Sequence, residues 1–169
     1  MATFLGPRRR SGHHQPARAV IIEAVPQDKV AVILLLQQSH HAAGFDGEDG
    51  FNFPFDPAYA ERLFLEHLLP GALCLVLKPD GGPARGVLMA AAAEHPFGPV
   101  RIARETVWFI EPGWRGVSAI KMLDAYEAWA RELGCQFAGM AGMGDDPEVA
   151  KLYWRRGYHV AERHFLKAV

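Results

Sequence analysis

The stretch best suited to chemistry runs from Thr106 to Leu123, where a β-prone segment, a proline-bearing turn and a helical segment follow one another. A turn that ends at a helix N-terminus presents free backbone N–H groups and the positive end of the helix dipole. Both features suit a phosphate or pyrophosphate group, and Arg115 adds a formal positive charge. The stretch therefore indicates an anion site, with an ordinary strand-to-helix connection as the alternative.

The eight histidines and two cysteines do not form a metal-binding pattern. The histidines lie singly or as adjacent pairs, and no pair is followed by a carboxylate at the spacing of metal ligands. Cys74 and Cys135 are far apart in apolar surroundings, which is typical of buried thiols in a reducing compartment. We therefore expect no metal, no disulfide framework and a cytoplasmic location.

The elements that must position this turn are predicted to form one domain over residues 17–169, preceded by a basic tail over residues 1–16. Runs rich in β-branched and aromatic residues predict strands over 18–25, 72–77, 85–92, 102–110, 135–140 and 158–166. Apolar residues at three- and four-residue spacing predict helices over 30–38, 57–69, 116–133 and 146–156. This order predicts an α/β (α+β) fold with a mixed, mostly antiparallel sheet and helices on both faces.

Composition and charge exclude several classes of protein. With 169 residues, half of them hydrophobic and 22% charged, the chain is predicted to be a single soluble domain. A formal net charge of -1 argues against nucleic-acid binding through bulk positive charge. The longest apolar runs are far shorter than the roughly 20 residues that a membrane span needs. We therefore expect no nucleic-acid partner and no membrane partner.

Two stretches resemble motifs of the GNAT-type N-acetyltransferases, and the order of elements is similar over residues 18–167. The first, residues 112–120 (PGWRGVSAI), is similar to the loop with which that family wraps the CoA pyrophosphate. Its Pro112, Arg115 and Gly116 fit the pattern, whereas Ser118 and Ile120 stand where the family usually has Gly, and Gly or Ala. The second, residues 146–158, resembles a family helix that ends in Leu-Tyr, a basic pair, Gly and an aromatic residue. The spacing is similar to that of short bacterial and phage members.

The resemblance implies a sheet of six to seven strands with about four helices, and transfer of acetyl from acetyl-CoA to a primary amine by direct attack. It implies Tyr153 as the general acid near the CoA sulfur and Glu105 as the base, with Glu111 as the nearest substitute. A core aromatic and a solvated carboxylate are the alternatives for these residues. The cofactor-binding residues that it implies are Phe109, Ile110, Arg115, Gly116, Val117, Ser118, Ala119, Ile120 and Asp146. A non-catalytic GNAT-like interaction or structural module is the alternative function, favoured by Ser118 and Ile120.

An aromatic and acidic segment lies between the first two predicted helices, where the family builds its acceptor pocket. We expect Phe51, Phe53 and Phe55 to bind the acceptor, and the acidic residues among them favour a cationic amine. Alternatively, the phenylalanines anchor a long loop to the core. The acceptor is expected to be a small-molecule amine or a protein amine, and a homodimer is left open.

Overall fold

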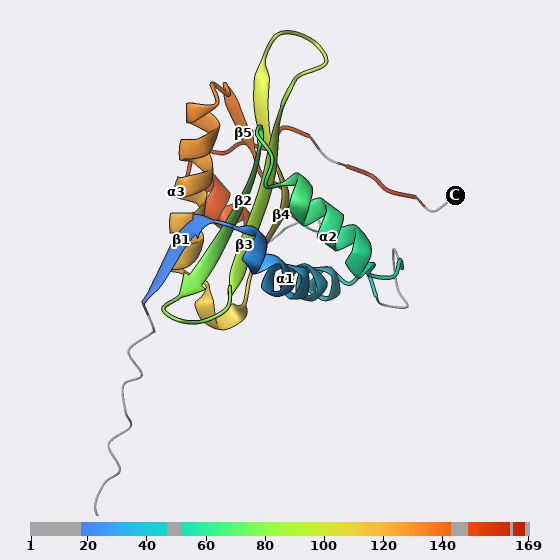
Figure 1. The fold of residues 1–169 in the computed structure, drawn as a ribbon. Helices are drawn as coiled ribbons and strands as arrows, with labels where there is room; N and C mark the ends of the chain where they lie inside the picture. The colour runs from blue at the N-terminus through green and yellow to red at the C-terminus, as the bar shows by residue number, and fades with distance from the viewer. Residues whose placement is uncertain (1–17, 47–51, 143–148, 163, 168–169) are drawn as a thin grey trace, which may run out of the picture.

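The computed structural model describes residues 18–46, 52–142, 149–162 and 164–167, so the predicted tail over residues 1–16 lies outside it. Its centre is one five-stranded sheet in the order β1-β2-β3-β4-β5 (Figure 1). The strands are β1 (Ala19–Glu23), β2 (Ala72–Pro79), β3 (Gly86–Glu94), β4 (Arg101–Ile110) and β5 (Phe137–Gly139). The first four pair antiparallel with their neighbours, and β5 lies parallel to β4. The predicted mixed, mostly antiparallel sheet is confirmed.

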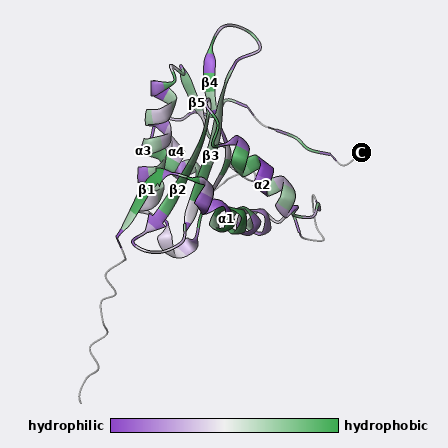
Figure 2. Ribbon diagram, in the orientation of Figure 1, coloured by the Kyte–Doolittle hydropathy of each residue, from purple (hydrophilic) through white to green (hydrophobic). Residues whose placement is uncertain are grey.

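The interior of the sheet is built from nearly continuous apolar runs. Residues 73–77 of β2 and 86–90 of β3 are buried on both faces, as expected when both sides of a sheet are covered. Figure 2 shows the green of hydrophobic residues along these strands and mixed colours along the helices. Gly86 is required by close packing, because a Cβ there would lie 3.0 Å from the Ile110 side chain.

Helices α1 (Lys29–Ala42) and α2 (Pro57–Glu66) cover one face of the sheet, and a 3-10 turn, η1 (Pro26–Asp28), leads into α1. Val32, Leu35 and Phe64 are the fully buried contacts of this layer. Helix α2 begins as predicted: the Asp56 side chain accepts hydrogen bonds from the N–H groups of Ala58 and Tyr59 at 2.8 and 3.1 Å.

Helices α3 (Val117–Glu132) and α4 (Ala150–Arg155) cover the other face, after a 3-10 turn, η2 (Pro112–Trp114). Met122, Leu123 and Tyr126 bury one side of α3 completely. Gly134, with φ at +71°, follows the end of α3 in the left-handed conformation that the sequence predicted. Two helices on each face confirm the predicted layers. Among the residues that the structure describes, no helix combines the length and the hydropathy that a membrane span requires.

The prediction of six to seven strands is wrong for the described part of the chain, which contains five. Residues 158–162 and 164–167 form no strand, although their composition favours one. Strand propensity takes effect only when a neighbouring strand supplies hydrogen bonds and packing, and here Val160 and Phe165 are 79% and 88% exposed. The fifth strand is also shorter than the predicted 135–140, and α1 extends beyond the predicted residue 38 to Ala42.

Candidate active site

The site lies where β4 loses its neighbour. Among the described residues, β4 and β5 pair only from Ile102 and Phe137 to Arg104 and Gly139. Strand β4 then continues to Ile110 with no described strand on that side, and we call this part of it the free edge of β4. The last paired residues are fixed by Tyr126 of α3, whose fully buried hydroxyl lies 3.0 Å from the Ala103 carbonyl oxygen and 2.9 Å from that of Gly139. One hydroxyl therefore sets where the free edge of β4 begins.

Glu105 and Tyr153 meet at this point. Glu105 is the first residue of β4 beyond the pairing, and its Oε2 accepts a hydrogen bond from the Ala141 N–H at 2.8 Å. The Tyr153 hydroxyl, from α4, donates to the Ala141 carbonyl oxygen at 2.8 Å. The structure thus brings together, on the backbone of one residue, the two side chains that the sequence marked as base and acid.

Burial changes the acidity of both groups. Burial raises the pKa of Glu105, and hydrogen bonds from the backbone of Ala141 and Trp108 oppose this only in part. Burial also raises the pKa of Tyr153 far above its ordinary value, and the charge of Glu105 raises it further. At neutral pH Tyr153 is therefore a protonated hydrogen-bond donor, and burial makes the carboxylate form of Glu105 more basic than one in water.

Trp108 covers the Tyr153 ring from β4. The two rings stack with centroids 6.2 Å apart and an interplanar angle of 29°. The indole Nε1 is buried and has no hydrogen-bond partner among the described residues. An unpaired donor beside the predicted acid is a polar group that a ligand carbonyl could satisfy.

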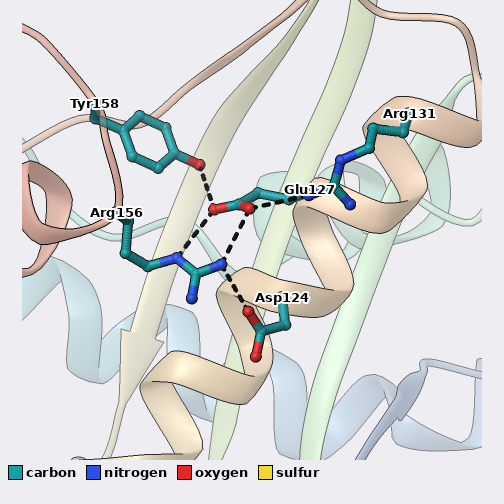
Figure 3. A network of polar contacts seen from close by, with 5 residues as sticks. All are labelled: Asp124, Glu127, Arg131, Arg156 and Tyr158. Carbon is teal, nitrogen blue, oxygen red and sulfur yellow. Dashed lines mark hydrogen bonds and ion pairs between the residues drawn. The ribbon is translucent and has the colours of Figure 1, made fainter.

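A network of polar contacts fixes α4, and with it Tyr153, against α3 (Figure 3). Arg156, at the end of α4, donates to Glu127 of α3 from Nε at 3.1 Å and from Nη2 at 3.0 Å. The same Nη2 lies 2.6 Å from Asp124, and the Tyr158 hydroxyl donates to Glu127 at 3.3 Å. Arg156 and Glu127 are only 22% and 17% exposed, so this paired contact is partly shielded from water.

The N-terminus of α3 is open in the way an anion site requires. Gly116 precedes it with φ at +81°, a conformation that favours glycine, and no side chain caps the helix. Within the described ranges, the N–H groups of Gly116, Val117 and Ser118 have no backbone acceptor. Ile120 is 42% exposed, and its N–H bonds back to Gly116.

Arg115 is anchored beside these N–H groups. Its side chain is exposed, and its Nε donates to the Ile110 carbonyl oxygen at 2.9 Å. The guanidinium is thereby held at the end of β4, and its two Nη groups are not used by this bond. The predicted turn, its arginine and the free helix N-terminus therefore stand together at one end of β4.

The predicted acceptor-binding residues lie elsewhere, around a cavity of about 730 Å³. It is lined by the C-terminal half of α1, residues 52–55, Phe109, Pro112 and Arg115. Phe53 packs against Phe45 with ring centroids 4.7 Å apart, and His40 contacts Phe45, Phe53 and Phe55. Phe53 and Phe55 thus line this cavity, and Phe109 joins them from β4, whereas Ile110 is buried in the core. Two predicted residues, Phe51 and Asp146, lie outside the described residues.

Two residues that the sequence did not single out also lie beside the start of the free edge. The His67 Nε2 is 2.9 Å from the Thr106 hydroxyl, and its Nδ1 is 2.7 Å from the Leu63 carbonyl oxygen. His67 was one of several scattered histidines in the sequence, and Thr106 read as an ordinary β-branched strand residue. The contact is visible only in the structure, where the end of α2 lies beside β4.

Comparisons with known proteins place this geometry in a known fold. No protein-family model matches the chain, and no curated protein matches it. Three similar solved structures are an acetyltransferase from Trypanosoma brucei, a ribosomal-protein-alanine N-acetyltransferase from Brucella melitensis biovar Abortus 2308, and a predicted acetyltransferase with acetyl-CoA from Clostridium acetobutylicum. Their sequence identities are 13%, 17% and 14%, and their TM-scores are 0.67, 0.69 and 0.70. The matches cover 90%, 90% and 89% of this chain, and 100%, 99% and 96% of the respective structures. The resemblance noted in the sequence is confirmed at the level of structure: the chain has the fold of the GNAT-type acetyltransferases.

Proposed function

We propose that this protein is an acetyl-CoA-dependent N-acetyltransferase that transfers the acetyl group directly to a primary amine. The observation that carries the proposal is the meeting of Glu105 and Tyr153 on Ala141, where the free edge of β4 begins. The open N-terminus of α3 lies beyond the other end of the same edge. Similarity to solved acetyltransferases, one of them with acetyl-CoA, supports the same function.

The residues present suit the phosphate groups of acetyl-CoA. Gly116, Val117 and Ser118 would bind the pyrophosphate through their free N–H groups, and Arg115 would add its two Nη groups. The free edge of β4 around Phe109 and Ile110 would offer backbone groups to the rest of the cofactor, apart from the Ile110 carbonyl oxygen that Arg115 contacts. Ala119 and Ile120 begin the helix behind this site.

Each catalytic side chain has a defined task in this proposal. Bound acetyl-CoA supplies the thioester. Tyr153 donates its proton toward the departing sulfur, since its raised pKa keeps it protonated at neutral pH. Glu105 accepts the proton of the amine through a water molecule, and its raised pKa makes it a better proton acceptor. Glu111, the nearest substitute, is paired with Arg85 at 3.3 Å.

The cavity lined by Phe53 and Phe55 is the proposed entrance for the acceptor, because it combines aromatic side chains with polar ones and reaches Arg115. Asp46 at its rim is paired with His41 at 2.5 Å, so this carboxylate is already partly neutralised. The class of acceptor is a small-molecule amine or a protein amine. The second candidate function, a non-catalytic GNAT-like module, is favoured by Ser118 and Ile120, which replace the usual small residues of the cofactor loop.

An acceptor panel tests the proposal. The protein is incubated with acetyl-CoA and a polyamine, a lysine peptide, a peptide with a free N-terminus, an aminoglycoside or an amino acid, and the released CoA thiol is measured. At least one amine should give turnover that falls in Tyr153→Phe and in Glu105→Gln. Arg131→Ala serves as the control, because this residue is 69% exposed and belongs to neither predicted role. No turnover with any amine, together with no binding of acetyl-CoA, would favour the non-catalytic module.

A further inference from the structure

We propose that the Thr106 hydroxyl oxygen binds the acceptor amine, and that His67 is the positioning residue that turns this oxygen toward it. The inference rests on the proposed acetyl transfer and names how the acceptor is recognised. It concerns the face of β4 opposite the one against which Tyr153 packs. It is drawn from the hydrogen bonds of His67 and from a bulge in β4.

The hydrogen bonds of His67 fix the direction of the Thr106 hydroxyl. The Leu63 carbonyl oxygen can only accept, so the imidazole Nδ1, 2.7 Å away, carries a hydrogen and donates it. In the neutral imidazole, Nε2 is then the acceptor, and the Thr106 hydroxyl, 2.9 Å away, donates to it. The hydrogen of Thr106 is thus committed to His67, and the lone pairs of its oxygen are left for another donor.

A β-bulge presents Thr106 at the surface. Met89 of β3 pairs with Val107 and the next residue, Ala90, pairs with Glu105, so Thr106 is the extra residue of β4. Thr106 is exposed, whereas His67 is only 7% exposed. An exposed threonine therefore has its hydroxyl bonded, at a partly buried position, to a buried imidazole.

The same bulge separates the two faces of β4. Trp108 packs with the α3 layer, and the Glu105 carboxylate bonds Ala141 beside Tyr153 on that side. Val107 packs with the α1 and α2 layer, and Thr106 faces His67 at the end of α2. Tyr153 and Trp108 lie on the first side, where they would contact the thioester, so in this proposal the amine approaches the thioester carbonyl from the second side, where Thr106 lies.

The direction of the hydroxyl also selects the chemistry of the acceptor. An oxygen whose hydrogen is already donated offers only lone pairs, so it attracts an N–H group and not a carbonyl. The Thr106 oxygen would accept a hydrogen bond from the amine N–H, while the lone pair of the amine nitrogen attacks the thioester carbonyl carbon. No proton needs to pass through Thr106. Glu105 is the first residue of β4 beyond its pairing with β5, so a water molecule at this edge would carry the amine proton to its carboxylate.

Steady-state kinetics of Thr106→Val and Thr106→Ser test the inference, using the amine with the highest turnover in the panel. Valine keeps the shape of threonine and removes the hydroxyl at an exposed position, so the fold is preserved. We expect Thr106→Val to raise the KM of the amine by about 3- to 10-fold, the size of one hydrogen bond, with the KM of acetyl-CoA unchanged. Thr106→Ser should restore the wild-type value.

The role of His67 is tested separately with His67→Gln, because the glutamine amide can turn either its N–H or its C=O toward Thr106 and so does not fix the direction of the hydroxyl. We expect the KM for the amine to rise in His67→Gln as it does in Thr106→Val. The double variant should show no further rise, because both changes remove the contact between the Thr106 oxygen and the amine. If His67→Gln does not fold, Thr106→Val alone decides. Unchanged amine KM in Thr106→Val, or an equal rise in the KM of acetyl-CoA, would overturn the inference.

Calorimetry distinguishes this failure from failure of the proposed function. Wild type and Thr106→Val should bind acetyl-CoA with the same dissociation constant, because Thr106 lies on the acceptor side. Equal binding combined with an unchanged amine KM overturns the role of Thr106 and leaves acetyl transfer standing. Absence of acetyl-CoA binding by wild type overturns both.

Discussion

Removing the hydroxyl of Tyr126 tests how the site is held together. In Tyr126→Phe, the buried carbonyl oxygen of Ala103 and the partly buried one of Gly139 both lose a donor at about 3 Å. Leaving buried acceptors without a donor costs about 1–3 kcal/mol, and water cannot replace the hydroxyl because Tyr126 is fully buried. Since one hydrogen is shared by two acceptors, we expect a loss of about 1–2 kcal/mol in the free energy of unfolding.

Urea unfolding followed by circular dichroism measures this loss. With an m-value of about 2 kcal/mol/M, the midpoint should fall by about 0.5–1 M while m stays constant. Tyr158→Phe is the matched control, since it removes a hydroxyl that contacts Glu127 at 3.3 Å from a partly exposed position, and it should cost at most about 0.5 kcal/mol. Hydrogen exchange should also quicken in Phe137–Gly139. Equal midpoints for wild type and Tyr126→Phe would refute the reasoning.

Three further variants separate catalysis from stability. Tyr153→Phe should lower turnover by about 100-fold and leave the affinity for acetyl-CoA unchanged, because the ring still stacks on Trp108. Equal losses of turnover, measured by kinetics, and of acetyl-CoA affinity, measured by calorimetry, would contradict a role as proton donor. The fold raises the pKa of Glu105, so the folded protein favours the protonated side chain. This contribution to stability is fully present below the pKa of the unfolded chain and is lost as pH rises through the pKa of the folded one. Glu105→Gln should therefore unfold at a higher temperature than wild type at pH 7, and the gap should close at about pH 4; a gap independent of pH would count against this. Arg156→Ala should cost about 1 kcal/mol in urea unfolding because Glu127 loses a two-bonded partner, and an effect no larger than that of the exposed Arg131→Ala would show that the network does not hold α4.

The order of elements could be read from the sequence because each element carries a local signal. The apolar runs of β2 and β3, the Asp56 cap of α2 and the glycine after α3 all act within a few residues. The final strand could not be read in this way. Its propensity is satisfied only by a partner strand, and the described residues 158–162 and 164–167 have none.

The site was predictable to a similar extent. Arg115 and Gly116 were recognisable because a motif joins them to a helix start, and Glu105 and Tyr153 through the resemblance to a family. Their meeting on Ala141 depends on where the pairing of β4 with β5 ends, which is a long-range property set by Tyr126. The contact of His67 with Thr106 left no pattern, since it joins α2 to a bulge that no residue type marks.

Calorimetric titration of acetyl-CoA into wild type and Arg115→Ala tests the central claim most directly. Wild type should bind more tightly than about 1 mM, the affinity that corresponds to roughly 4 kcal/mol. Arg115→Ala should weaken binding by about 1–3 kcal/mol, less so at high salt, because a charged donor is lost from an anion site at the start of α3. Wild-type binding weaker than millimolar, or Arg115→Ala binding as tightly as wild type, would contradict the account.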